Sequence, residues 1–146
     1  MPNRHRSREL VVQWVYQWML NPIDLPLAKT RSRAFWEDQA EGSSENQAYF
    51  ESTALGVLGR LPEIDKKIEA LLTNWRMDRL EKVDLAILRV GSFEILFQDE
   101  TQKADIPVII DEAVEIAKKF GTKESPSFIN GILDKVRNER KDMQNE

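Results

Sequence analysis

Residues 78–98 of the chain read DRLEKVDLAILRVGSFEILFQ and form its longest periodic run of apolar side chains. In a helix of 3.6 residues per turn, these side chains cover more than half of the circumference. They are Leu80, Val83, Leu85, Ile87, Leu88, Val90, Ile95 and Leu96. A helix that is apolar over so much of its surface is typical of the centre of a fold, so we expect the other elements to pack around it.

Helical patterns also fill most of the chain on either side of this run. The spacing of apolar residues and the end signals predict helices at residues 7–20, about 27–38, 46–60, 62–75, 78–98, 105–121 and 125–136. Ser7 and Ser125 are expected to cap helix N-termini, and Gly121 is placed to end a helix. Strand-like alternation is absent. The sequence therefore predicts an all-α domain of six or seven helices.

Composition excludes several classes of protein. The 146 residues suffice for one ordinary domain, and 41% hydrophobic with 32% charged residues is typical of a folded one. The absence of cysteine rules out disulfides, zinc fingers and thiol nucleophiles, and the single histidine, His5, argues against a His-ligated metal cluster or a Ser–His–Asp triad. No glycine-rich phosphate loop occurs. We expect no enzyme activity, no metal and no cofactor.

No run of 18 apolar residues occurs, and the N-terminus lacks the pattern of a secretory signal peptide. The expected location is the cytoplasm, without a membrane partner. The net charge of −4 argues against a generally basic coat for nucleic acid, so any anion-binding surface must be local.

One local basic cluster consists of Arg4, Arg6 and Arg8, around the start of the first helix. Guanidinium groups there can bind phosphates, and exposed aromatic side chains can stack unpaired bases, which together are typical of proteins that bind single-stranded RNA. Tyr16 is the aromatic residue of this helix most suited to such an exposed edge, whereas the spacing of Trp14 and Trp18 indicates core positions. Charge alone leaves a merely solubilising arm equally open.

A second unusual stretch is GTKESPSFINGILD, residues 121–134. Gly121 and Ser125 bound a tight, exposed corner, and the pattern leaves open whether Phe128 just after it turns to the core or to solvent. Gly131 inside a helix costs roughly 1 kcal/mol relative to alanine, so we expect a neighbouring helix to pack closely against it.

Four stretches together resemble the NusB family of bacterial transcription antitermination factors. They are RSRELVVQWVYQW, EKVDLAILRVGSFEIL, DIPVIIDEAVEIAKKFG and SPSFINGILDKV. The last two, in this order and spacing, are the specific ones, and the resemblance covers nearly all of residues 4–137. Residues 22–46 match nothing in the family firmly. His5 and Ser127 depart from the basic residues that members often have at those positions.

The resemblance implies a fold of two packed three-helix subdomains in a single domain, with an N-terminal half at about 1–75 and a C-terminal half at about 76–140. It also implies binding to single-stranded boxA RNA of nascent ribosomal transcripts, together with the ribosomal protein NusE, in the RNA polymerase antitermination complex. On matching positions, the implied RNA contacts are Arg4, Arg6, Arg8, Tyr16, Lys123 and Phe128. The implied contacts to NusE are Asp84 and Glu124.

Three alternatives accompany this interpretation. A helical adaptor that binds only proteins remains a rival hypothesis, with an incidental basic arm. A homodimer that covers the RNA surface is left open by the sequence. The fold also resembles the N-terminal domain of a ribosomal RNA cytosine methyltransferase, but 146 residues leave no room for the cofactor-binding domain of that enzyme.

Overall fold

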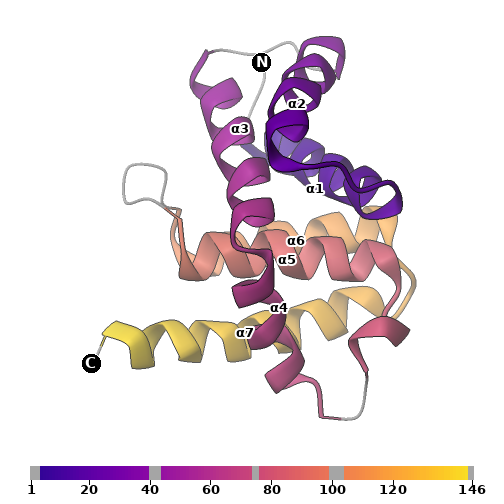
Figure 1. Ribbon diagram of the computed structural model, residues 1–146. Helices are drawn as coiled ribbons and strands as arrows, with labels where there is room; N and C mark the ends of the chain where they lie inside the picture. The colour runs from indigo at the N-terminus through magenta and orange to yellow at the C-terminus, as the bar shows by residue number, and fades with distance from the viewer. Residues whose placement is uncertain (1–3, 40–43, 74–75, 99–103, 145–146) are drawn as a thin grey trace.

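The chain folds into seven α-helices and one short 3₁₀ helix in a computed structural model that describes residues 4–39, 44–73, 76–98 and 104–144 (Figure 1). The elements are α1 (Arg4–Leu20), α2 (Leu25–Gln39), α3 (Ser44–Gly59), α4 (Leu61–Leu71), η1 (Met77–Arg79), α5 (Lys82–Leu96), α6 (Ile106–Phe120) and α7 (Ser125–Gln144). These ranges contain no strand, which confirms the predicted all-α class. None of the described helices is long and apolar enough to cross a membrane.

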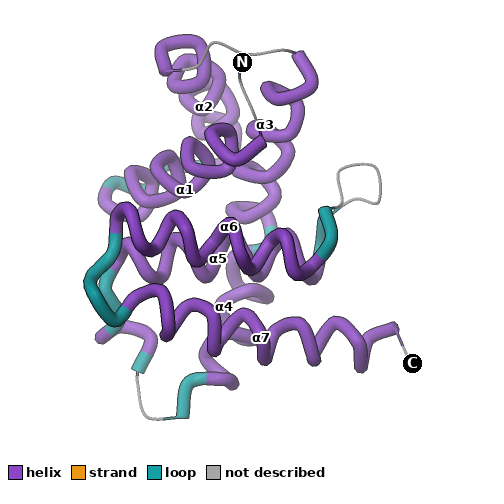
Figure 2. The backbone as a smooth tube through the Cα atoms, turned by 180° about the vertical axis from the view of Figure 1, so that it is seen from behind, coloured by secondary structure: helices purple, strands orange, loops and turns teal. Residues whose placement is uncertain are grey.

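The helices form two groups of three that meet at α5. Helices α1, α2 and α3 pack on one another, and α5, α6 and α7 do the same, while α4 packs against α5 and α7. Figures 1 and 2 show α5 and α6 side by side across the middle, with α7 on one side and α1–α3 on the other. Helix α5 contacts α1, α3, α4, α6 and α7, so the prediction of a central helix is confirmed.

Two glycines allow helices to approach closely, and neither was singled out from the sequence. A Cβ atom on Gly91 of α5 would lie 2.9 Å from a methyl carbon of Leu133 in α7, and a Cβ atom on Gly56 of α3 would lie 2.2 Å from the ring of Phe93. Gly131 has nothing within 4 Å of an added Cβ and is exposed. The prediction of close helix packing at Gly131 is therefore wrong, because this face of α7 points outward.

Helix ends differ from the prediction at several places. The helix predicted at residues 62–75 ends as α4 at Leu71, and the one predicted at residues 125–136 continues as α7 to Gln144. Helix α1 begins at Arg4, so the basic cluster is helical and Ser7 is buried inside the helix instead of capping it. The central run is divided into η1 and α5, which begins at Lys82. Gly121 follows the last residue of α6, as predicted. Ser125 is the first residue of α7, and its Oγ accepts a hydrogen bond from the Thr122 N–H of the preceding turn, so the N-cap predicted at Ser125 is not the one that the structure shows. The weakly patterned segment does contain a helix, α2, but residues 40–43 lie outside the described part of the chain.

Candidate functional site

Arg8 lies inside the fold, at the junction of four helices. Its side chain is 3% exposed, and its Nε and Nη2 donate hydrogen bonds of 2.7 and 2.8 Å to the two carboxylate oxygens of Glu94 in α5. Its Nη1 donates a third, of 3.0 Å, to Glu112 in α6. The Tyr49 hydroxyl of α3 donates to the same Glu94 at 3.0 Å. These bonds join α1, α3, α5 and α6.

Burial and the charge of Glu94 shift the pKa values of Arg8 and Tyr49 in this cluster. Burial acts to lower the pKa of Arg8, but the hydrogen bonds and charge of Glu94 outweigh burial and hold that pKa above its ordinary value. Burial, followed by the charge of Glu94, raises the pKa of Tyr49 well above its ordinary value, so its hydroxyl keeps its proton and donates it to the carboxylate. Arg8 is thus a fixed, internal cation.

The three arginines predicted to contact RNA therefore have different surroundings. Arg6 is exposed, with Nη1 3.1 Å from a carboxylate oxygen of Glu9. Arg4 is half-buried, and its guanidinium carbon lies 4.1 Å from the centre of the Tyr49 ring. The prediction that the Arg8 guanidinium is available at the surface is wrong, because this group is buried and already pairs with the carboxylates of Glu94 and Glu112.

The aromatic residues of α1 lie on different faces. Trp14 is buried, which confirms its predicted core position. Trp18 is half-buried at the edge of the core, and its indole donates a 2.9 Å hydrogen bond to the Ile23 carbonyl. Tyr16 is also half-buried and packs against the core. It follows Arg4 by twelve residues, which at 1.5 Å per residue is about 18 Å along the helix axis. Helix α1 therefore carries basic residues in its first two turns and Tyr16 about three turns further along.

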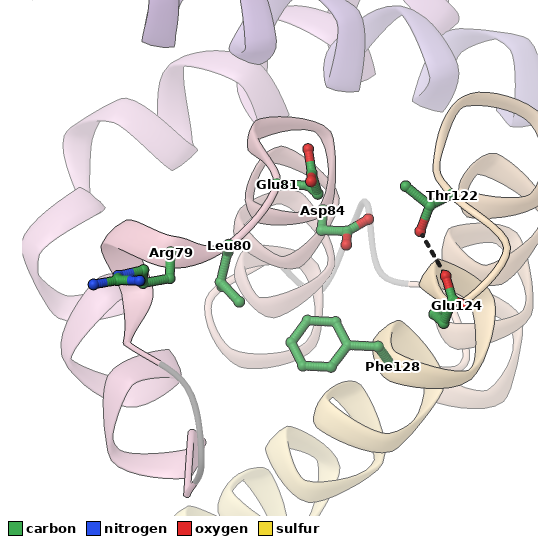
Figure 3. A pocket seen from close by; sticks show the side chains of 7 residues that line it. All are labelled: Arg79, Leu80, Glu81, Asp84, Thr122, Glu124 and Phe128. Atoms are coloured by element: carbon green, nitrogen blue, oxygen red, sulfur yellow. Dashed lines mark hydrogen bonds between the residues drawn. The ribbon is translucent and has the colours of Figure 1, made fainter.

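A second group of predicted residues meets in one cavity of about 390 Å³ (Figure 3). Asp84 from α5, Glu124 from the turn before α7, and Phe128 from the first turns of α7 all line it. The remaining lining residues are Arg79, Leu80, Glu81 and Thr122. Phe128 is half-buried, and Figure 3 shows its ring pointing into the cavity. The question that the sequence left open is thereby answered, since the ring faces neither the core alone nor bulk solvent.

Asp84 lines this cavity with a carboxylate that lacks one of its hydrogen-bond partners. The residue is only 7% exposed, and its Oδ1 atom is buried without a hydrogen-bond partner. Burial raises the pKa of Asp84, a hydrogen bond from Ser125 opposes that rise, and the charge of Glu81 adds to it. A buried carboxylate oxygen without a donor costs free energy, so a donor or cation that enters the cavity would relieve that cost.

The turn between α6 and α7 holds this arrangement in place. The backbone N–H of Thr122 donates a 2.9 Å hydrogen bond to Ser125 Oγ, which ties the turn to the start of α7. Thr122 Oγ1 lies 3.5 Å from Glu124 Oε2, and both residues line the cavity (Figure 3). Lys123, between them, is exposed and does not line the cavity. The turn thus carries an exposed cation, Lys123, and a carboxylate, Glu124, that lines the same cavity as Asp84.

The end of α6 carries functional candidates that sequence reasoning missed. From the sequence alone, the helix dipole accounts for Lys118 and Lys119 in the last turn, and the apolar spacing of the helix predicts that Phe120 points inward. In the structure Phe120 is exposed, and Lys119 reaches Glu9 of α1 at 3.1 Å. Only the spatial approach of α6 to α1 distinguishes Lys119 from Lys118. Among the side chains that the structure describes, no group of His, Asp and Glu is arranged to hold a metal ion.

Known proteins of one family resemble this chain in sequence. The sequence model of the NusB family matches residues 5–138. Two proteins named transcription antitermination protein NusB are similar along nearly their whole length. The one from Thermoanaerobacter sp. (strain X514) is 43% identical over 133 residues, covering 90% of this chain and 87% of the relative. The one from Sorangium cellulosum (strain So ce56) is 40% identical over 136 residues, covering 93% and 92%.

Solved structures of NusB chains have a similar fold. T. maritima NusB superposes with a TM-score of 0.80 at 30% identity, covering 94% of this chain and 92% of that one. A NusB chain crystallised with NusE and double-stranded RNA superposes with a TM-score of 0.79 at 22% identity, covering 94% and 98%, and shows the shared fold. A family match over most of the chain, relatives of 40% and 43% identity and the same helical architecture lead to one conclusion: the chain belongs to the NusB family.

Proposed function

We propose that this chain is a transcription antitermination factor. It binds the boxA element of nascent ribosomal RNA together with the ribosomal protein NusE, and it supports read-through by RNA polymerase in the antitermination complex. The observation that carries the proposal is the presence of two neighbouring surfaces of opposite character. One is cationic and aromatic, along α1 and the end of α6, and the other is the acidic cavity beside the α6–α7 turn.

The RNA surface in this proposal consists of Arg4, Arg6, Tyr16 and Lys123. Arg6 and Lys123 are exposed cations that can neutralise phosphates, and Tyr16 supplies an accessible aromatic edge for an unpaired base. Arg8 contributes by fixing the position of α1 and not by touching RNA. Because few phosphates are neutralised, affinity for RNA alone should be modest and sensitive to salt.

The partner surface is the cavity that contains Asp84 and Glu124. A basic side chain of NusE that enters it would pair with the unsatisfied Oδ1 of Asp84 and lie against the Phe128 ring. Phe128, which the resemblance implies as an RNA contact, shares this cavity with both acidic residues. We therefore place Phe128 at the junction where RNA and partner meet. The factor acts by binding and not by catalysis, in the cytoplasm where the transcript is made.

The test is a titration of fluorescently labelled boxA RNA and of a scrambled RNA of equal length, each with and without purified NusE. The proposal expects boxA to bind more tightly than the scrambled RNA, and NusE to increase the difference. Asp84→Ala should remove the effect of NusE while leaving the weak binding to RNA alone nearly unchanged. Equal affinity for both RNAs in both conditions would favour the adaptor hypothesis instead.

A further inference from the structure

The Glu9 carboxylate collects three basic side chains on the surface between α1 and α6. Its oxygens lie 3.1 Å from Arg6 Nη1, 3.2 Å from His5 Nε2 and 3.1 Å from Lys119 Nζ. The Glu9 side chain is only 6% exposed, whereas those of Arg6 and Lys119 are 46% and 58% exposed. The carboxylate therefore lies beneath cations whose other faces meet solvent, and the two fixed positive charges exceed its single negative charge.

The two fixed cations are close enough to act on one anion. Arg6 Nη1 and Lys119 Nζ each lie 3.1 Å from the same oxygen, Glu9 Oε2, so they are at most about 6 Å apart and one phosphate can accept a hydrogen bond from each. The fold, and not the sequence, brings them together, since one residue opens α1 and the other is in the last turn of α6.

An exposed aromatic ring adjoins this pair. Phe120 is 38% exposed, and Lys119 Nζ lies 5.2 Å from the centre of its ring. Free phosphate needs only the cations, whereas a nucleotide of a single strand offers a phosphate and a base that can stack on an aromatic face. The combination therefore favours RNA over a small anion.

We propose that Lys119 and Phe120 form a nucleotide-binding subsite with Arg6, in which Arg6 and Lys119 bind one phosphodiester of the RNA and Phe120 stacks an adjacent base. The subsite rests on the proposed RNA-binding function and extends it to two residues at the end of α6. It lies on the same side of α6 as the start of α1 and is separate from the cavity that contains Asp84.

Lys118 provides a matched control for Lys119. Both side chains are 58% exposed, both carry one charge, and each lies 3.1 Å from a single carboxylate, which is Glu115 for Lys118 and Glu9 for Lys119. The replacements Lys118→Gln and Lys119→Gln change the net charge equally, so any difference between them reports position and not overall electrostatics. Phe120→Leu keeps an apolar side chain while removing the aromatic face.

The experiment measures boxA affinity by fluorescence anisotropy over a series of salt concentrations for the whole chain and the three variants. We expect Lys119→Gln to reduce affinity several-fold and to reduce the slope of log affinity against log salt by about 0.7, the value for one lost contact to a single strand. Phe120→Leu should reduce affinity at least about fivefold with an unchanged slope. Lys118→Gln should behave like the unaltered chain.

Equal losses in Lys118→Gln and Lys119→Gln, or a Lys119→Gln variant that keeps the unaltered affinity and slope, would overturn the subsite. In both cases the unaltered chain still binds boxA, so the proposed function survives. If the unaltered chain shows no preference for boxA, with or without NusE, the proposed function itself fails and the subsite fails with it. Thermal melting of each variant verifies that it is folded. The lysine variants should melt nearly like the unaltered chain, because surface ion pairs contribute little to stability.

Discussion

Replacing Arg8 with glutamine is expected to destabilise the fold strongly, because it removes the only cation paired with the buried Glu94 among the contacts that the structure describes. The Arg8–Glu94 pair has side-chain exposures of 3% and 0% and two hydrogen bonds of 2.7 and 2.8 Å. In the variant, Glu94 would keep the Tyr49 hydroxyl as a donor, which cannot neutralise its charge. The cost is therefore that of an unpaired charge inside the protein.

The magnitude follows from that description. Breaking a buried ion pair on one side costs about 3–5 kcal/mol. In a chain of about 150 residues each kcal/mol lowers Tm by about 2–4 °C, so the expected decrease is about 6–20 °C. Arg6→Gln, which removes an exposed partner of Glu9, should change the free energy of unfolding by no more than about 1 kcal/mol.

The assay is urea denaturation at pH 7 for both variants, combined with boxA binding under conditions in which each is folded. Because Arg8→Gln can lower the folded fraction severely, the double variant Arg8→Gln with Glu94→Gln accompanies it. Neutralising both partners should restore part of the lost stability, since no buried charge is then unpaired. An Arg8→Gln variant that melts like the unaltered chain but loses boxA affinity would show that Arg8 contacts phosphate after all.

Three further predictions concern the cavity and the glycines. Burial raises the pKa of Asp84, so the folded chain binds the carboxyl proton more tightly than the unfolded chain does. The ionised carboxylate therefore lowers the stability of the fold at pH values above its ordinary pKa and not below it. Asp84→Asn should accordingly raise Tm at pH 7, and this gain should disappear as the pH falls below about 4. Gly131→Ala should stabilise by about 0.5–1 kcal/mol in urea denaturation, because its Cβ meets open space. Gly56→Ala should destabilise by about 1–3 kcal/mol, because its Cβ would overlap the Phe93 ring. A stable Gly56→Ala or a destabilised Gly131→Ala would contradict the described packing.

Local patterns were sufficient to predict the helices. Apolar periodicity and end signals gave the number, order and approximate bounds of the helices, and even the weak pattern around residues 27–38 corresponds to α2. The first helix was predicted to begin too late because Ser7 is a residue type that often caps a helix N-terminus. Arginine is nevertheless a good helix former, and here α1 starts at Arg4.

Pairings between distant residues could not be predicted in the same way. Arg8 and Glu94 are 86 residues apart, and nothing in the sequence near Arg8 distinguishes it from Arg6. The same holds for glycines, since only the packed structure shows that Gly91 faces Leu133 while Gly131 faces outward. The family resemblance, by contrast, named three residues that line one cavity, Asp84, Glu124 and Phe128, although they lie on separate elements.

The most direct test of where RNA binds is photo-cross-linking of boxA RNA that carries 4-thiouridine, followed by mass spectrometry of the protein peptides. If RNA lies along α1 and the end of α6, cross-links will occur at Tyr16 and Phe120 and will disappear when unlabelled boxA competes. Cross-links confined to α2, α3 or the outward face of α7 would contradict the proposed surface, however tightly the RNA binds.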